Sequence, residues 1–434
     1  MGIALALLAI LAAMAVLMYL NRLPALAALP VMAIAIGLVA RLPWADLAAV
    51  VSEGALYLHQ AYATAMLGAV LAEIVSKSGV AETLVKKAAE LGGDRPLVLS
   101  LLLTGVVALL FTTLGGLGAV IMVATIVFPI LLALGLPQVA VGGLFLLGMS
   151  LGGILNLTNW QLYKQTLGLS TSVILSFAAP LAGLMALAVA AFAARELRPS
   201  RRRRLWHDPP PHDDRPAFAP WYALLTPIIP LLLVLGFGLY NLLGRPHPPV
   251  EFPIITAMVV GIAYGLAVSP RPPQGRVQLL ARSTVDGIGA VAPAVALMLG
   301  IGMLITAVTH PLVRDQVRPL LAAVLPSTRL GYIVVFTVLA PLALYRGPLN
   351  IWGMGFGLAA MMAAAPALGP AAVMAALLAV GQIQGVCDPT NTHNVWIANY
   401  VGVSTQEILR RTIVYVWPAS AAGLVVGALM FMGR

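Results

Sequence analysis

The sequence predicts an all-α polytopic membrane protein built from two halves of similar design. The 434 residues are 61% hydrophobic and only 9% charged, whereas soluble domains carry about 25% charged residues. The mean hydropathy is +0.97, and one span needs about 20 apolar residues, so the chain has room for about ten spans and little else. A repeated order of polar clusters, described below, points to the two halves.

Apolar runs bounded by charges, or by proline and glycine clusters, predict the simpler spans. The first run, 2–20, has no charged segment before it and no polar cleavage zone after it. We therefore expect it to remain as a span and not to act as a removable signal peptide. The predicted spans are 2–20, 24–40, 56–78, 171–194, 219–243, 251–269, 285–309 and 412–432.

Two further apolar tracts are too long for one span each. Tract 96–194 has Lys164 as its only charge, and tract 330–406 has only Arg346 and Asp388. Each tract is interrupted by short polar or glycine-rich clusters, so we expect each half to contain a re-entrant hairpin followed by a broken helix. The predicted hairpins are about 97–135 and 330–367, with tips at 112–116 and 345–350, and the predicted breaks are 156–159 and 388–394.

The same order of motifs recurs at a nearly constant offset of 231 to 234 residues. Shared order and spacing are stronger signs of a duplication than any single match. The matched positions are Arg95 with Arg329, Gly116 with Gly347, Leu134-Gly135 with Leu368-Gly369, Asn156–Asn159 with Asp388–Asn391, and Gly168–Thr171 with Gly402–Thr405. We predict two repeats, 1–195 and 219–434, joined by the arginine-rich linker 196–218.

The linker fixes the predicted topology. Seven arginines lie between 195 and 215, and a short loop this basic is expected in the cytoplasm. With five crossings and one hairpin in each half, 17 of the 25 cations fall inside and six outside, which leaves Lys164 and Arg346 within the membrane. An odd number of crossings inverts the second repeat relative to the first, a construction common in secondary transporters. We expect the N-terminus outside and the protein in the inner membrane of a prokaryote.

Four helix ends would meet at the two hairpin tips and the two breaks. Free N–H groups at helix N-termini suit a carboxylate, and neutral oxygens suit a small cation such as Na⁺. Thr158, Asn159, Thr390 and Asn391 supply such oxygens. The alternative is that these residues only cap the broken helices.

Arg346 is the single residue that most strongly indicates the kind of substrate. A cation at membrane depth is costly, and the guanidinium fork matches a carboxylate. The alternative is a structural pair with Asp388, which is itself a candidate carrier of H⁺ or Na⁺. His393 is a candidate proton relay or anion donor, whereas Lys164 is expected to extend toward an interface.

Other classes of function fit the sequence poorly. Nucleic-acid binding is not expected despite the net charge of +10, because the cations lie in short loops between apolar runs. We expect no enzyme activity, since neither a Ser-His-Asp nor a His-Glu-x-x-His signature occurs in the sequence. The glycine-rich segments are not expected to form a phosphate-binding loop. The single cysteine, Cys387, excludes a disulfide or a cysteine metal cluster within the chain.

The stretch Ile74–Glu82, an amphipathic helix up to Asp94-Arg95-Pro96, a glycine-rich hairpin tip and the break Asn156–Trp160 resemble the ion transporter superfamily. The citrate–metal symporters and gluconate permeases are closest in pattern. The segment Thr392–Thr412 is similar to the corresponding part of gluconate permeases. The resemblance covers most of the chain, in order more than in identity.

The resemblance implies an elevator-type transporter, usually a homodimer. A scaffold, about 1–55 and 219–284, would hold a transport domain, about 56–195 and 285–434. The family places substrate and cation at the tips and breaks, with H⁺ or Na⁺ as the coupling ion and no other cofactor. The substrate-binding candidates are Thr112, Thr113, Gly115, Gly116, Asn156, Thr158, Asn159, Arg346, Gly347, Asn350, Thr390, Asn391, Thr392 and His393; those for cation coupling are Asp388, Thr158, Asn159, Thr390 and Asn391, with Na⁺ at Asn156, Asn159, Asp388 and Asn391.

The first hypothesis is a cation-coupled symporter of a small organic anion, such as citrate, gluconate, another hydroxy or sugar acid, or a dicarboxylate. The alternatives are a monovalent cation/proton antiporter, with Asp388 as its carrier, and a channel or scaffold for a partner. The expected partners are the anion, the lipid bilayer and a second copy of the chain.

Overall fold

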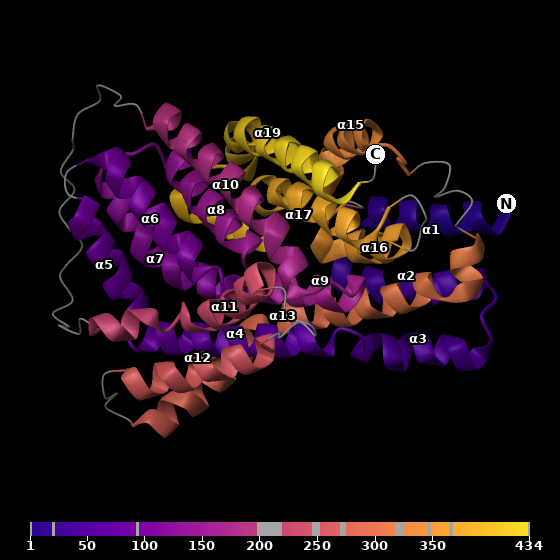
Figure 1. The fold of residues 1–434 in the computed structure, drawn as a ribbon, viewed down its shortest axis with the longest axis horizontal. Helices are drawn as coiled ribbons and strands as arrows, with labels where there is room; N and C mark the ends of the chain where they lie inside the picture. Colours follow the sequence, from indigo (N-terminus) through magenta and orange to yellow (C-terminus); the bar gives the residue numbers. More distant parts are fainter. Residues whose placement is uncertain are drawn as a thin grey trace.

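A computed structural model shows the protein to be helical throughout its described part, with no β-strand in it (Figure 1). The structure describes residues 2–19, 22–92, 95–197, 219–244, 252–269, 275–316, 325–345, 349–363 and 368–432. The predicted linker 196–218 therefore lies almost wholly outside the described residues, as do Arg346 and Gly347.

The first half contains ten helices. They are α1 (Gly2–Tyr19), α2 (Ala25–Val39), α3 (Trp44–Leu56), α4 (His59–Lys77), α5 (Val80–Gly92), α6 (Pro96–Leu110), α7 (Gly116–Ala133), α8 (Gln138–Ile154), α9 (Leu157–Leu167) and α10 (Thr171–Glu196). α6 and α7 form the predicted hairpin, and α8 and α9 form the predicted broken helix, bent by 46°.

The second half follows a similar order. Its elements are η1 (Trp221–Leu225), α11 (Ile229–Gly244), α12 (Ile254–Val268), α13 (Arg276–Thr309), α15 (Arg329–Leu339), η2 (Ala340–Ala343), η3 (Ile351–Gly355), α16 (Phe356–Ala363), α17 (Pro370–Cys387), α18 (Thr392–Val401) and α19 (Thr405–Phe431). The short segment η3 is a single π-helical turn at the start of the second arm of the hairpin.

Within the described ranges, five helical stretches are long and apolar enough to cross a membrane, and the bent α8–α9 pair makes a sixth. The five are Trp44–Lys77, Thr171–Glu196, Arg276–Thr309, Pro370–Val401 and Thr405–Phe431. Shorter apolar helices, such as α2, α6 and α12, accompany them. The chain is thus an all-helical polytopic membrane protein, while the five crossings per half stay a prediction.

Several helical stretches extend beyond the predicted spans. The span predicted at 56–78 is part of a helical stretch that starts at Trp44, that at 285–309 starts at Arg276, and that at 412–432 starts at Thr405. Charge-bounded apolar runs locate only the hydrocarbon-crossing part of a helix. Charged residues continue the helix beyond it, as Asp46 does in the first turn of α3.

The long helices α3, α4 and α13 run along one edge of the molecule, with α2 also packed on α13 (Figure 1). Small residues allow close approach of the backbones. A Cβ atom on Gly54 of α3 would lie 2.8 Å from the Cα atom of Met303, and one on Gly287 of α13 would lie 2.8 Å from the backbone of Ala69. These glycines fix the antiparallel packing of α3–α4 against α13.

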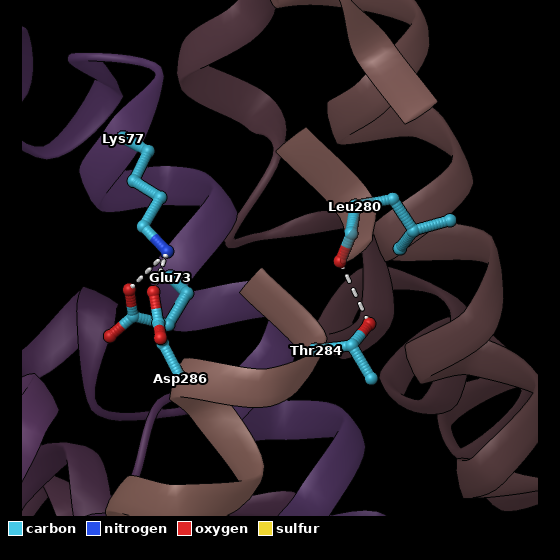
Figure 2. A network of polar contacts seen from close by, with 5 residues as sticks. All are labelled: Glu73, Lys77, Leu280, Thr284 and Asp286. Atoms are coloured by element: carbon cyan, nitrogen blue, oxygen red, sulfur yellow. Dashed lines mark hydrogen bonds and ion pairs between the residues drawn. The ribbon is translucent and has the colours of Figure 1, made fainter. Parts of the chain in front are cut away.

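Ionic contacts lie at both ends of this antiparallel pair. Figure 2 shows the Lys77 ammonium between two carboxylates, 3.1 Å from Glu73 Oε2 and 2.5 Å from Asp286 Oδ2. At the other end, His310 Nε2 lies 3.4 Å from Asp46 Oδ2. All these side chains are partly exposed, so each pair contributes modestly to stability.

The broken helices end in the same way. The C-cap residues of α9 and α18, Gly168 and Gly402, adopt left-handed conformations with φ of +65° and +76°. The side chains of Ser170 and Ser404 then cap α10 and α19.

Candidate functional site

The first hairpin tip is held by the residue that breaks α8 from α9. The Asn156 side-chain amide donates to Phe111 O at 2.8 Å and to Leu114 O at 3.0 Å, both at the tip. Its Oδ1 accepts from the backbone N–H groups of Thr158 and Asn159, at 3.0 and 3.2 Å, and so caps α9. An amide offers two donors and two acceptor positions, and all four are used.

Asn156 therefore acts as a structural link between the break and the tip. The backbone adds a parallel bond, in which Leu157 N–H donates to Thr112 O at 3.1 Å. No lone pair of the buried Asn156 amide is left for a cation, which favours the capping role over the predicted Na⁺ contact at this residue.

The other residues of the first tip differ in their contacts. The Thr112 hydroxyl donates to Leu109 O at 2.7 Å, within its own helix end. The buried Thr113 hydroxyl donates to Pro227 O at 2.9 Å and thereby ties the tip to the turn before α11. Gly116 begins α7 with φ +84°, a conformation that favours glycine, and no other heavy atom lies within 4 Å of a Cβ placed on Gly115.

The two remaining candidates at the first break are half-buried. Asn159 donates from Nδ2 to Gly153 O at 3.1 Å and so satisfies the last turn of α8. The neighbouring Trp160 does the same for Ile154 O, at 2.8 Å. Thr158 is the predicted ligand of this break whose side chain is least committed to capping.

The second break centres on a buried carboxylate. Asp388 follows α17, and its side chain is almost fully buried. Its Oδ1 accepts from Tyr345 N–H at 3.0 Å, from Thr390 N–H at 2.9 Å and from the Thr390 hydroxyl at 2.7 Å. Oδ2 accepts from Asn350 Nδ2 at 3.2 Å. The carboxylate thus joins the break to both sides of the second tip.

The second tip is itself ordered by Asn350 and strained at Tyr345. Asn350 also donates to Ala343 O at 3.2 Å and accepts from Trp352 N–H at 2.9 Å, which caps the π-helical turn. Tyr345 has φ +55°, an unfavourable conformation for a bulky side chain, and this turns its N–H toward Asp388. Strain at this position is consistent with a functional site.

The remaining candidates lie at the start of α18. Asn391 is its N-cap residue, and Thr392 is exposed while His393 is half-buried. Arg346 and Gly347 lie outside the described residues, between Tyr345 and Leu349. The structure brings together Asp388, Thr390 and Asn350. Asn391, Thr392 and His393 follow Thr390 directly in the sequence.

Two buried amides at or near the second break were not named as single candidates, although Asn394 ends the predicted break 388–394. Asn394 donates from Nδ2 to Val386 O at 3.2 Å and to Asp388 O at 3.0 Å, yet its buried Oδ1 finds no hydrogen-bond partner among the described residues. The same holds for Oε1 of the buried Gln384. Gln384 lies in an otherwise apolar stretch of α17, and that pattern could have identified it from the sequence, whereas Asn394 ends the polar cluster 388–394.

The chemistry of the second break suits a small hard cation or a proton. A buried carboxylate and unpartnered amide oxygens are ligands of the kind that Na⁺ accepts, and an unpartnered buried oxygen is costly without a ligand. No group of three or more His, Cys, Asp or Glu residues in the described part of the chain could hold a metal ion. The arrangement is not that of a transition-metal centre.

The two breaks are linked through the helices that precede them. The Ser150 hydroxyl on α8 donates to Gln382 Oε1 on α17 at 2.7 Å, and both side chains are buried. Ser150 lies six residues before Asn156, and Gln382 lies six residues before Asp388. The bond joins α8 and α17 at equivalent distances from their breaks.

Solved structures of two membrane transporters share this arrangement of helices. The YdaH transporter of Alcanivorax borkumensis matches with a TM-score of 0.53 and 16% identity, over 86% of this chain and 86% of that chain. MtrF of Neisseria gonorrhoeae, described with a class of antimetabolite efflux pumps, matches with a TM-score of 0.54 and 14% identity, over 85% and 81%. No protein-family model matches the sequence, and no curated protein is similar to it.

Proposed function

We propose that this chain is a secondary active transporter that carries a small organic anion together with H⁺ or Na⁺. The anion is a carboxylate, such as citrate, gluconate, another hydroxy or sugar acid, or a dicarboxylate. The observation that carries the proposal is the buried Asp388 carboxylate, held between a helix break and a hairpin tip. Beside it lies Asn394, whose Nδ2 bonds Asp388 O and whose Oδ1 has no partner among the described residues. An ionisable residue at such a depth is expected to serve function.

Within this proposal the second break binds the coupling cation, and the anion binds beside it. Asp388 carries the cation, with Thr390 and Asn391 as neutral neighbours, while Arg346 pairs with the substrate carboxylate. Coupling follows because the cation offsets the charge of Asp388, and the loaded site is then favourable for the anion. The anion also meets the N-terminal N–H groups of the broken helices.

The fold supports an inverted repeat and an elevator mechanism. The stretches Trp44–Lys77 and Arg276–Thr309 each have 34 residues and start 232 positions apart. The same separation relates Ser150 and Gln382, which bond to each other. We infer membership in the ion transporter superfamily, near the citrate–metal symporters and gluconate permeases, with scaffold and transport parts as predicted above.

The proposal includes a homodimer in the inner membrane of a prokaryote, with the N-terminus outside and the linker 196–218 in the cytoplasm. The scaffold spans 1–55 and 219–284 would form the fixed part of each copy. Nucleic acid is not a partner in this account.

A cation/proton antiporter is the second candidate, because a single buried carboxylate such as Asp388 is sufficient to exchange two cations. One protein of similar fold is described with efflux pumps, so outward transport of an anion is compatible with the same site. An antiporter has no use for Arg346 at a hairpin tip, and this distinguishes the two candidates.

The test is Arg346→Ala, assayed as uptake of radiolabelled citrate and gluconate into proteoliposomes. We expect loss of uptake, because the guanidinium provides the charge that binds the carboxylate. The matched control is Lys164→Ala, which removes another cation of the long apolar tracts, one that donates to Thr171 at 3.0 Å. Full anion transport by the Arg346 variant would refute this assignment.

A further inference from the structure

The first long helical stretch is interrupted between α3 and α4 without a proline or glycine at the break. α3 ends at Leu56, α4 starts at His59, and Tyr57 and Leu58 form a turn between them. In an unbroken helix, Ala61 N–H would donate to Tyr57 O, four residues earlier. Ala61 N–H instead donates to Leu58 O at 2.9 Å and to a side chain of α9.

That side chain is Gln165, whose amide stands in place of the missing backbone bond. Its Oε1 accepts from Ala61 N–H at 2.9 Å, and its Nε2 donates to Tyr57 O at 3.3 Å. The two groups that would bond each other in a continuous helix are thus both satisfied by one inserted amide. Side chains inserted into the helical hydrogen-bond pattern are a known cause of bends.

Further bonds hold α9 against this break. The Tyr57 hydroxyl donates to Gln165 O at 3.3 Å, and Gln161, one turn earlier on α9, donates to Gln60 Oε1 at 2.6 Å. The other end of α9 starts at the Asn156 cap, which is bonded to the first hairpin tip. α9 therefore connects the tip to the break in the long helix.

The second long helix loses the same bond by different means. At the offset of 232 that relates the two 34-residue stretches, Tyr57 corresponds to Gly289 and Ala61 to Pro293. Pro293 lies inside α13 and has no N–H group, so it cannot donate to Gly289 O. Both long helices thus lack one backbone hydrogen bond at the same position along their length.

We propose that α3–α4 and α13 bend at these two points, Tyr57–Ala61 and Gly289–Pro293, and that Gln165 holds the first hinge open and links it to the hairpin tip through α9. The hinges lie close to the predicted boundaries between scaffold and transport parts, at 55/56 and 284/285. Because the two helices are antiparallel, the hinges lie at different levels: Tyr57 packs against Gly302, whereas Gly287, close to the second hinge, packs against Ala69. The purpose of the bending rests on the proposed transport function, but the bending itself is measurable without a substrate.

The direct test measures distances across each hinge in the absence of substrate. Spin labels are placed on cysteines at Trp44 and Ser78 for the first hinge and at Val277 and Leu312 for the second, in a Cys387→Ala background in nanodiscs. Each pair spans a helical stretch of about 50 Å at 1.5 Å per residue. Pulsed electron resonance then reports the mean distance and the width of its distribution.

Gln165→Leu is expected to narrow the distribution across the first hinge and lengthen its mean. Without the inserted amide, Tyr57 O loses its side-chain donor and Ala61 N–H keeps only Leu58 O, so the helical bond from Ala61 N–H to Tyr57 O can form and the helix closes. The matched control is Asn399→Leu on α18, at the position that corresponds to Gln165. An unchanged or broader distribution in the Gln165 variant would refute its role.

Pro293→Ala is expected to narrow the distribution across the second hinge and to raise the melting temperature, because a backbone bond is regained. Uptake of radiolabelled citrate or gluconate should fall about tenfold in this more stable protein, since the conformational step is slowed. Pro418→Ala, in the interior of α19, is the control and should stabilise without slowing uptake. Unchanged distances in Pro293→Ala would contradict the hinge. Because the distances are measured without substrate, a wrong choice of anion cannot produce that result.

Discussion

The two helix breaks lie at corresponding positions of the predicted repeats, yet one is closed by a neutral amide and the other by a carboxylate. Asn156 uses both donors and both acceptor positions of its side chain to join α9 to the first hairpin tip. Asp388 performs the same joining role at the second tip, through Tyr345 and Asn350, but brings a negative charge with it. The geometry of a hairpin tied to a break therefore needs only an amide.

The difference shows where function has been added to a shared scaffold. The second break combines Asp388 with Asn394, whose Oδ1 has no partner among the described residues, whereas the amide of Asn156 at the first break is saturated. A buried charge is costly, so its presence at only one of two equivalent positions requires a purpose beyond structure. We infer that the first break mainly supports the fold and that the second binds the coupling cation.

Asp388→Asn is expected to have the largest effect on transport. Asparagine retains the size and most acceptor capacity of aspartate but removes the charge, so the second break becomes like the first. We expect accumulation of radiolabelled citrate or gluconate against its gradient to fall to the level of empty vesicles, with the protein still folded. Accumulation at the wild-type level would show that the carboxylate is dispensable.

Asn156→Ala should lower the stability of the protein and leave coupling intact, the opposite of Asp388→Asn. It leaves two tip carbonyls and two N–H groups of α9 without their partner, and we expect a loss of about 2–4 kcal/mol in the free energy of unfolding. Thermal unfolding in detergent measures the effect, with Asn159→Ala, which removes one hydrogen bond to Gly153, as the milder control. Coupling per folded molecule should be retained; a stable but uncoupled variant would place the cation at the first break.

Asn394→Ala tests the last residue of the predicted break, which was not named as a single ligand from the sequence. Removing one neutral oxygen ligand should weaken the apparent affinity for the coupling cation by about tenfold, equivalent to about 1.4 kcal/mol. The dependence of anion uptake on Na⁺ concentration or pH gives that affinity. A change in maximal rate alone, with the cation dependence unaltered, would assign Asn394 to positioning of Asp388.

Lys77→Met should have the smallest effect. The ammonium bridges Glu73 and Asp286 between α4 and α13, but all three groups are partly exposed. Exposed ion pairs of this kind contribute about 0.5–1 kcal/mol, so a small decrease in melting temperature and nearly normal uptake are expected. Loss of uptake would mean that this cluster, and not the second break, controls the coupled step.

The sequence predicts the hairpins and breaks well because polar clusters interrupt otherwise apolar tracts. The first tip is expected at 112–116 and lies between α6, which ends at Leu110, and α7, which starts at Gly116. The break near Asn156 is likewise observed between α8 and α9. Glycine and capping residues are local signals of a turn or a helix end, and their effect does not depend on contacts with distant segments.

Features that depend on contacts between distant segments could not be predicted. The interruption at Tyr57 has no proline or glycine, and it is stabilised by Gln165, more than 100 residues away. α13 and α19 start before the predicted spans, because charged residues bound an apolar run without ending the helix. The bonding of Asn156 and Asp388 to the tips depends on tertiary structure and follows from no local pattern.

The measurement that tests the central claim most directly is the cation flux that accompanies anion uptake. Vesicles containing the wild type, Asp388→Asn or Asn156→Ala receive citrate or gluconate, while ²²Na⁺ uptake and internal pH are recorded together. The account predicts anion-dependent entry of Na⁺ or H⁺ in the wild type and in Asn156→Ala, and neither in Asp388→Asn. Undiminished cation entry in Asp388→Asn, or its loss only in Asn156→Ala, would contradict the assignment of coupling to the second break.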